Sequence, residues 1–259
     1  MKKVMTIITV IILIVILGAI GFLSYGYYKN ATMEVKNPVA TMEVEGFGTI
    51  TMELYPDQAP ESVANFIALA NRGFYDGLTF HRIEKDFMIQ GGDKNGDGSG
   101  NAKKSDIEDN GEDTNYSIKG EFISNKVNNT IKFKEGTLAM ARSDYTQYSS
   151  SLTDESYNSG SSQFFITTKE NTSLNGYYAA FGTVTDGMDV VQKIAAVEVK
   201  ADDSSSSSSS ASTTPSKPVN PPVIKTIRVE TYGVDYGLPE LLTPFDYMSW
   251  IYSQYGVSQ

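Results

Sequence analysis

Two short segments of the chain bring together side chains that could bind a flexible ligand and stabilise charge on it. Residues 80–93 read FHRIEKDFMIQGGD, and residues 161–167 read SSQFFIT. Between them they supply a guanidinium at Arg82, carboxamides at Gln90 and Gln163, and several large apolar side chains. A cation beside apolar walls interacts strongly with charge that develops during a reaction, because such a site excludes water. These segments are therefore the first candidates for a functional site.

The composition excludes several other kinds of chemistry. The chain of 259 residues has no cysteine, so disulfides, thiol catalysis and zinc–thiolate sites are excluded. Its single histidine, His81, rules out histidine-rich metal sites and any Ser-His-Asp triad that does not use it. A formal net charge of −10 argues against nucleic-acid binding, which depends on clustered lysine and arginine. We expect no metal, no cofactor and no nucleic-acid partner.

The amino-terminal segment has the composition of a membrane anchor. Two lysines at positions 2 and 3 precede an uncharged stretch rich in Ile, Val and Leu, and about 20 helical residues are enough to cross a bilayer. We expect residues 1–3 to be cytoplasmic, 4–24 to form a transmembrane anchor or uncleaved signal, and 25–37 to form a stalk. The alternative is a signal peptide cleaved near Ala19 and Gly21, which would give a secreted protein. Both alternatives place the main domain outside the cytoplasm, and the first keeps it at the cell membrane.

The part of the chain that follows has the patterns of short strands and two helices. Residues 39–44 and 50–54 alternate with period 2 around a glycine-containing turn, which predicts a β-hairpin. Residues 61–70 and 188–197 carry apolar side chains at helical spacing. This mixture favours a β-rich domain capped by helices.

Three segments are rich in small polar residues. Residues 142–161 are expected to form a long loop. The serine-rich residues 201–222 cannot pack, yet residues 223–230 alternate again like a strand, so the serine-rich stretch is expected to be a loop within one domain. Residues 93–99 are similar to the start of a calcium-binding loop, but Lys104 stands where a bidentate glutamate is required. A glycine-rich turn is the expected structure there.

The two segments at 80–93 and 161–167, in that order, resemble the cyclophilin family of peptidyl-prolyl isomerases. The resemblance implies a mainly β fold over residues 38–232: a closed eight-stranded antiparallel barrel capped by two helices, with the active groove on its outer face. Residues 233–259 are then a C-terminal extension of unknown role, either an amphipathic helix on the domain or a contact for a partner or a membrane. The combination of an anchor with an acidic, cysteine-free domain is similar to exported proteins of Gram-positive bacteria. Further stretches similar to the family are Gly73-Phe74-Tyr75-Asp76-Gly77, Leu174-Asn175-Gly176 and Ala180-Phe181-Gly182.

The resemblance also assigns roles to individual residues. Arg82 corresponds to the catalytic arginine, and His81 to a residue that frames the site. Phe165 is expected in the core, because adjacent residues of a strand point to opposite faces. The positions that match substrate-binding residues are Phe87, Met88, Gln90, Ala141, Arg142, Gln163, Phe164, Leu174 and Tyr178.

The sequence departs from the family pattern at three positions. Tyr178 stands where many members have a histidine, and it keeps an aromatic wall with a polar tip. Arg142 replaces a common asparagine, which matters little if only the backbone is used. Ser173 replaces a tryptophan found in members that bind cyclosporin tightly, so cyclosporin binding is expected to be weak.

The expected function is a peptidyl-prolyl cis-trans isomerase that accelerates folding of exported, proline-containing polypeptides at the extracytoplasmic membrane face. Rotation about an X–Pro bond faces a barrier of ~18–20 kcal/mol, because amide resonance is lost in the twisted state. Apolar side chains would hold the proline ring, Gln90 would hold a carbonyl, and Arg82 would donate to the twisted amide. The alternatives are a catalytically weak peptide-binding or chaperone module, and a structural role in which residues 236–259 dock on a membrane complex.

Overall fold

The computed structural model describes residues 5, 12–25, 36–200 and 215–255, and divides the chain into two compact units, Met1–Lys36 and Asn37–Gln259. In the first unit, residues 12–25 are helical, and their apolar side chains are exposed. The expected anchor, 4–24, and stalk, 25–37, lie partly outside the described residues, and the expected cytoplasmic residues 1–3 lie wholly outside them. Within the described part of the chain, no helix has both the length and the apolar character needed to cross a membrane.

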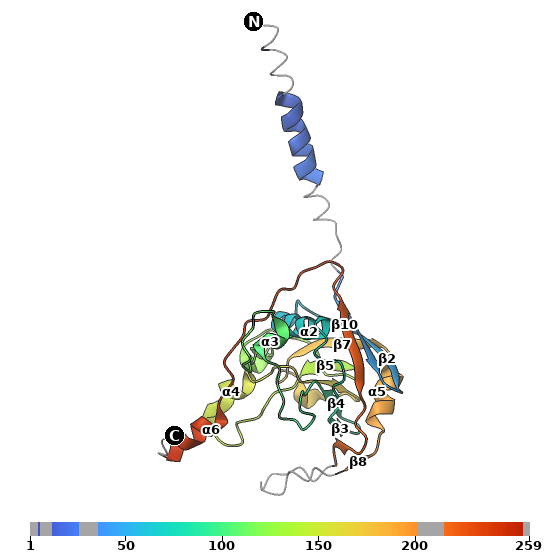
Figure 1. The fold of residues 1–259 in the computed structure, drawn as a ribbon, viewed down its shortest axis with the longest axis vertical. Helices are drawn as coiled ribbons and strands as arrows, with labels where there is room; N and C mark the ends of the chain where they lie inside the picture. Colours follow the sequence, from blue (N-terminus) through green and yellow to red (C-terminus); the bar gives the residue numbers. More distant parts are fainter. Residues whose placement is uncertain (1–4, 6–11, 26–35, 201–214, 256–259) are drawn as a thin grey trace. The chain divides into compact units, whose positions relative to one another are not determined.

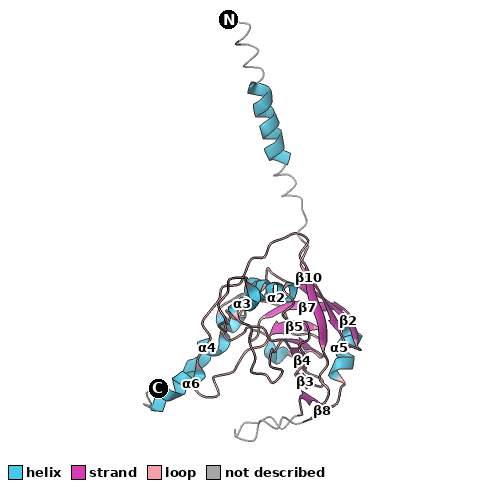
Figure 2. Cartoon of the chain, in the orientation of Figure 1, coloured by secondary structure: helices cyan, strands magenta, loops and turns pink. Residues whose placement is uncertain are grey.

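The main sheet of the second unit is antiparallel and has the order β10-β1-β2-β7-β5-β6-β4-β3. Figures 1 and 2 show its strands beside the helices that cover them. Figure 1 shows β10, from the far end of the chain, beside the blue amino-terminal hairpin, and β10 pairs with β1 along its length. A separate small ladder joins β8 (Val199–Lys200) to β9 (Lys217–Pro218). The strands of the main sheet are β1 (Val39–Val44), β2 (Gly48–Leu54), β3 (Arg82–Glu84), β4 (Met88–Gly91), β5 (Thr137–Met140), β6 (Phe164–Thr167), β7 (Ala180–Asp186) and β10 (Ile224–Glu230).

The sheet curls but does not close through a continuous ladder, so the expectation of a closed barrel was wrong in this respect. Its two edge strands, β3 and β10, are not paired with each other. The segments next to them meet through an isolated bridge between Thr79 and Val223, and the Phe80 N–H donates to the Pro222 carbonyl at 3.0 Å. The physical reason is local: Pro221 and Pro222 precede β10, and proline has no N–H to donate to a ladder.

The two expected helices are present as α2 (Pro60–Asn71) and α5 (Met188–Ala195). The helix α2 packs against β10, and α5 packs against β2 and β4. The predicted loop 142–161 was wrong in part, because it contains a 3-10 turn, η2 (Ser150–Leu152), and a short helix, α4 (Thr153–Tyr157). The other helical elements described are α3 (Lys104–Ile107), η1 (Ile123–Asn125), η3 (Thr172–Leu174) and α6 (Tyr247–Tyr255).

Alternation along the strands divides the apolar side chains between two clusters. The larger cluster fills the inner side of the sheet and includes Phe66 of α2 and Val191 of α5, both fully buried. The smaller cluster lies on the opposite side of the central strands β4, β5 and β6. Its buried members are Met88, Phe133, Ala139, Phe165, Leu174 and Ala180. The central strands are therefore apolar on both faces, and the smaller cluster lies where the candidate site is expected.

The amino terminus of α2 is capped from a distant part of the chain. Its N-cap residue, Ala59, offers no side-chain acceptor. The buried carboxylate of Glu121 instead accepts from the N–H groups of Glu61 and Ser62, at 2.9 and 2.8 Å, and from the Ser62 hydroxyl. Because the first N–H groups of a helix have no intrahelical partner, Glu121 takes the place of a local cap. Burial raises the pKa of Glu121, although these hydrogen bonds oppose the shift.

The C-terminal extension is attached to the domain and contains α6. Leu242 and Ser117 exchange two backbone hydrogen bonds of 3.0 and 2.8 Å. Tyr145, from the segment that follows β5, lies with its ring centroid 5.0 Å from Phe245 and 6.4 Å from Tyr247. Tyr247 in turn stacks near Trp250, with 6.1 Å between their ring centroids. The extension therefore packs against the segment that contains η2 and α4.

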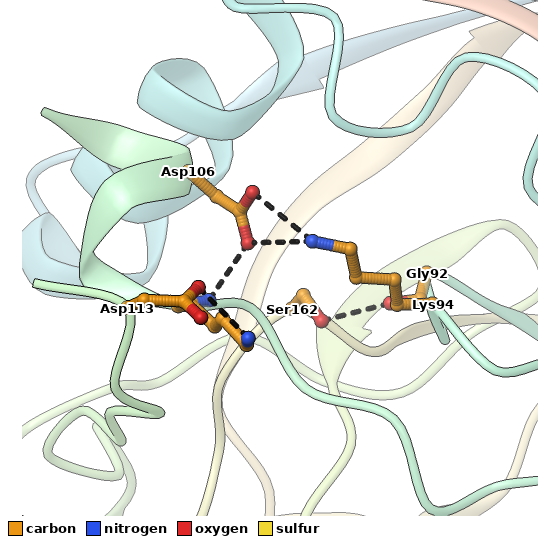
Figure 3. Close-up of polar contacts among 6 residues, drawn as sticks. Gly92, Lys94, Asp106, Asp113 and Ser162 are labelled. Carbon is orange, nitrogen blue, oxygen red and sulfur yellow. Dashed lines mark hydrogen bonds and ion pairs between the residues drawn. The ribbon is translucent and has the colours of Figure 1, made fainter. Parts of the chain in front are cut away.

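The loop that follows β4 is held by polar contacts (Figure 3). The Ser162 hydroxyl donates to the Gly92 carbonyl at 2.8 Å, and the Lys94 ammonium lies 3.2 Å from Asp106 Oδ1. Gly92 has a φ of 83°, and a Cβ there would lie 2.4 Å from the Ser162 carbonyl oxygen. Only glycine fits this turn, which explains the second glycine of the double glycine.

The loop that resembles a calcium site is a turn closed on its own backbone. The buried Asp93 carboxylate accepts from the N–H groups of Asn95, Asp97 and Gly98, the first two at 3.0 and 2.7 Å. Its oxygens therefore point toward the loop's own N–H groups. Among the residues that the structure describes, no group of three or more His, Cys, Asp or Glu side chains is placed to hold a metal ion.

Candidate active site

The candidate site is a groove over the smaller apolar cluster, with a cavity of about 130 Å³. It brings together residues from β3, β4, β6, η3 and the segments that follow β5 and η3. Eight of the eleven sequence-predicted site residues line it. The complete lining is Arg82, Phe87, Met88, Gln90, Ala141, Arg142, Phe165, Leu174 and Tyr178.

The pairing of four strands places the central side chains of this groove in one row. Arg82 of β3 is opposite Gln90 of β4, and Gln90 is opposite Phe165 of β6. Phe165 is in turn opposite Ala139 of β5. Paired residues of antiparallel strands share a face, so all four side chains emerge on the groove side of the sheet.

Two neighbours hold the Arg82 guanidinium. One Nη1 hydrogen bond, of 3.1 Å, goes to Gln90 Oε1, and Nη2 forms an ion pair with Glu84. The Arg82 side chain remains 42% exposed, so part of its guanidinium faces the groove. Since a guanidinium has five N–H donors, these two contacts leave donors for a ligand.

A second carboxamide fixes the orientation of Gln90. Gln90 Nε2 donates to Gln163 Oε1 at 2.9 Å. Gln163 Nε2 then donates to the carbonyl oxygens of Gly98 and Gly100, at 3.0 and 2.9 Å. Each amide therefore has its oxygen and nitrogen assigned by its partners, and Gln90 must present its oxygen to Arg82. Gln163 acts from the edge of the groove rather than from its lining.

The floor of the groove is apolar and aromatic. Phe165 is only 5% exposed, and its ring centroid lies 5.7 Å from that of Tyr178 in an edge-to-face arrangement. Beneath it, Phe133 stacks on Phe165 at 6.0 Å. Met88 and Leu174 complete the floor and are also buried. The arrangement combines a small pocket with an apolar floor and a fixed cation at its edge, which suits a ligand with an apolar ring beside a polar amide.

Comparison with known proteins decides the family. Residues 39–228 match the profile of "Cyclophilin type peptidyl-prolyl cis-trans isomerase/CLD". The chain belongs to this family. It is 39% identical over 157 residues to peptidyl-prolyl cis-trans isomerase-like 1 of Rhizopus delemar, covering 60% of this chain and 79% of that protein. It is 36% identical over 157 residues to the human protein of the same name, again covering 60% of this chain and 79% of its relative.

Comparison with solved structures supports the same family. A crystal structure of a Cryptosporidium parvum cyclophilin-type isomerase matches with a TM-score of 0.55 and 26% identity, over 75% of this chain and 98% of that one. A second structure of the same protein, in the presence of the dipeptide Ala-Pro, has a TM-score of 0.54. The chain is thus a cyclophilin-type peptidyl-prolyl cis-trans isomerase, as its two sequence segments indicated.

The structure places the two adjacent phenylalanines on the opposite faces from those expected. Phe164 was expected in the groove and Phe165 in the core, but the structure has the reverse. Phe164 is fully buried in the inner cluster, where its ring lies 5.6 Å from Phe66 and 5.5 Å from Tyr75. Phe165 lines the groove. The reason is the strand register, which pairs Phe165 with Gln90 and Phe164 with Gly91.

Arg142 contributes its side chain to the groove of this cyclophilin, whereas the sequence suggested that only its backbone would matter. Its guanidinium carbon lies 4.6 Å from the ring centroid of Tyr178 and 5.3 Å from that of Tyr157. Its Nε donates to the Tyr177 carbonyl at 3.2 Å. A cation over aromatic faces is favourable, so the side chain has a defined position.

His81 lies behind the groove and does not line it. The residue is 8% exposed, and its backbone N–H donates to the backbone carbonyl of Gln90 at 3.1 Å. Its two ring nitrogens have no hydrogen-bond partner among the described residues. Burial lowers the pKa of His81, as does nearby Arg82, while Asp93 acts in the opposite direction. We therefore treat His81 as a neutral residue that supports the strand of Arg82.

Proposed function

We propose that this isomerase binds proline-containing peptides in the groove and that Arg82 stabilises the twisted X–Pro amide. The observation that supports it most directly is the position of Arg82, hydrogen-bonded to Gln90 at 3.1 Å and still 42% exposed at the edge of the apolar floor. The proline ring would occupy the pocket over Phe165, and the Cryptosporidium parvum structure determined in the presence of the dipeptide Ala-Pro suggests a peptide of this type.

The chemistry needs no covalent intermediate. Twisting the X–Pro bond removes amide resonance, so the lone pair localises on the proline nitrogen, which becomes a better hydrogen-bond acceptor. A donor that binds this state more tightly than the planar amide lowers the barrier. Arg82 is such a donor, and its contacts with Gln90 and Glu84 hold it in place before the substrate twists.

The deciding experiment measures cis/trans exchange of an Ala-Pro peptide by NMR, with the chain from Asn37 onward and its Arg82→Ala variant. We expect the variant to lose about 10²–10³-fold in kcat/KM, the usual effect of removing one preorganised donor. Arg72→Ala is the matched control, because Arg72 is also ion-paired, with Asp109, but lies outside the groove. An unchanged rate in a folded Arg82→Ala protein would contradict the assigned role.

We also propose that the isomerase acts on exported polypeptides at the extracytoplasmic face of a membrane. The support is the composition of residues 2–23, two lysines followed by an uncharged apolar stretch, together with the helix at 12–25 whose apolar side chains are exposed. The test is fractionation of cells that express the full chain, followed by protease treatment of intact spheroplasts. Recovery in the membrane with a protease-accessible domain is the expected outcome, and a protease-protected domain would contradict it.

A further inference from the structure

The four arginines of the chain differ in their partners. Arg72, Arg82 and Arg228 each form an ion pair, with Asp109, Glu84 and Asp76 respectively. Arg142 forms none with the described residues, and the partners of its guanidinium are two carbonyl oxygens, of Tyr177 and Ser143. In a chain of net charge −10, an arginine without a carboxylate partner is unexpected.

Arg142 is nevertheless held firmly. Its guanidinium lies over the rings of Tyr178 and Tyr157, at 4.6 and 5.3 Å, and its Nη1 donates to the Ser143 carbonyl at 3.3 Å. Aromatic faces and neutral carbonyls orient a cation but do not neutralise its charge. The contacts account for Nε and one Nη1 hydrogen, so three of the five N–H donors are left for a ligand.

The position of Arg142 connects two cavities. It lines the groove of about 130 Å³ and also a neighbouring polar cavity of about 390 Å³. Neither cavity is lined by an aspartate or a glutamate. The nearest carboxylate in sequence, Asp144, is exposed and accepts from the N–H of Thr146 at 3.0 Å. The arginine is therefore the single charged residue in the lining of the polar cavity.

We infer that Arg142 makes this isomerase select peptides with an aspartate or glutamate close to the proline. The inference rests on the proposed function and names the substrate class of that site. Phe165 and Arg142 line the same groove of about 130 Å³, and consecutive Cα atoms lie about 3.8 Å apart, so a residue next to a proline over Phe165 would lie on the Arg142 side of this groove. A carboxylate there would form a charge-assisted hydrogen bond with the guanidinium, whereas a lysine would be repelled.

The test compares kcat/KM for matched peptides with Glu, Gln or Lys beside the proline, on either side, for the native chain, Arg142→Gln and Arg142→Lys. We expect the native protein to prefer Glu over Gln by roughly three- to tenfold, the range of a typical net hydrogen bond in water. The Glu-to-Gln ratio of kcat/KM should fall toward one in Arg142→Gln and remain partly raised in Arg142→Lys. In the native protein it should decrease at high salt. The Arg72→Gln variant is the control and should keep the preference.

Failure of this inference can be distinguished from failure of the proposed function. Suppose that Arg82→Ala loses exchange with all peptides, while the native chain and Arg142→Gln have the same Glu-to-Gln ratio of kcat/KM. This result would overturn only the role of Arg142. If no peptide is isomerised, the same Glu-to-Gln ratio is measured as an equilibrium dissociation constant, with and without the Arg142→Gln change. A Glu-to-Gln ratio of dissociation constants that is the same with and without the Arg142→Gln change would also overturn the inference.

Discussion

The guanidinium of Arg82 donates a hydrogen bond of 3.1 Å to the side-chain oxygen of Gln90, directly across the β3–β4 pair. Gln90 is in turn bonded to Gln163, which reaches the carbonyls of the loop at Gly98 and Gly100. A chain of oriented dipoles therefore extends from this loop to the cation in the groove. Because each group in this hydrogen-bonded series has only one orientation that satisfies its partners, Arg82 is positioned before any substrate binds.

The two adjacent phenylalanines should respond differently to the same substitution. Phe164→Ala is expected to lower the free energy of unfolding by about 3–5 kcal/mol, the usual effect of opening a cavity in a packed core, with little change in kcat/KM. Phe165→Ala should cost less stability, since its ring borders the groove, but should lower kcat/KM at least tenfold because the proline pocket loses its floor. Urea unfolding and peptide exchange at a temperature where both variants are folded provide the measurements. The reverse pattern would contradict the assignment of the two faces.

Glu121 should contribute to stability through the start of α2. Glu121→Ala removes the acceptor for the N–H groups of Glu61 and Ser62 and leaves them without a partner. We expect a loss of about 1–3 kcal/mol in the free energy of unfolding, measured by urea denaturation. The control is Glu170→Ala, which removes an exposed carboxylate from a loop. Equal stability of the two variants would mean that Glu121 does not act as the cap of α2.

The stability of the domain should fall as the pH drops below about 6.5, the ordinary pKa of histidine. Burial lowers the pKa of His81 in the folded state, so the unfolded chain takes up a proton at a higher pH than the folded one. The stability that depends on neutral His81 is therefore complete above pH 6.5 and decreases toward the lower folded pKa. His81 is the only histidine, so urea unfolding between pH 7 and 5.5 should show this slope in the native chain and not in His81→Gln. Identical slopes would contradict the argument.

The packing of the C-terminal extension can be followed through Trp250, the single tryptophan of the chain. Tyr145→Ala removes the ring that contacts Phe245 and Tyr247. We expect a red shift of tryptophan emission and a loss of about 0.5–1.5 kcal/mol per aromatic pair in the free energy of unfolding. Tyr177→Ala, which removes an exposed ring away from this cluster, is the control and should leave the emission unchanged. An unchanged spectrum in Tyr145→Ala would show that the extension is held by other contacts.

The sequence by itself determined the family, the two principal helices and most of the groove. The reason is that these features depend on local pattern: apolar spacing for α2 and α5, and the close succession of Arg82, Phe87 and Gln90 along one hairpin. In a β-hairpin, side chains at alternate positions share a face whatever the rest of the fold does. Residues near each other in such a hairpin are therefore placed together by the sequence alone.

Only the tertiary structure decided which of two equivalent faces each residue occupies and which distant segments meet. Phe164 and Phe165 have the same side chain, and only the pairing of Phe165 with Gln90 selects the one in the groove. The cap of α2 comes from Glu121, about sixty residues further along the chain, and no local signal marks it. The orientation of Arg142 depends on Tyr178, which is about 36 residues away in the sequence and is brought beside it by the pairing of β7 with β5. Contacts of this kind depend on strand register and long-range packing, which the local alternation of residues does not specify.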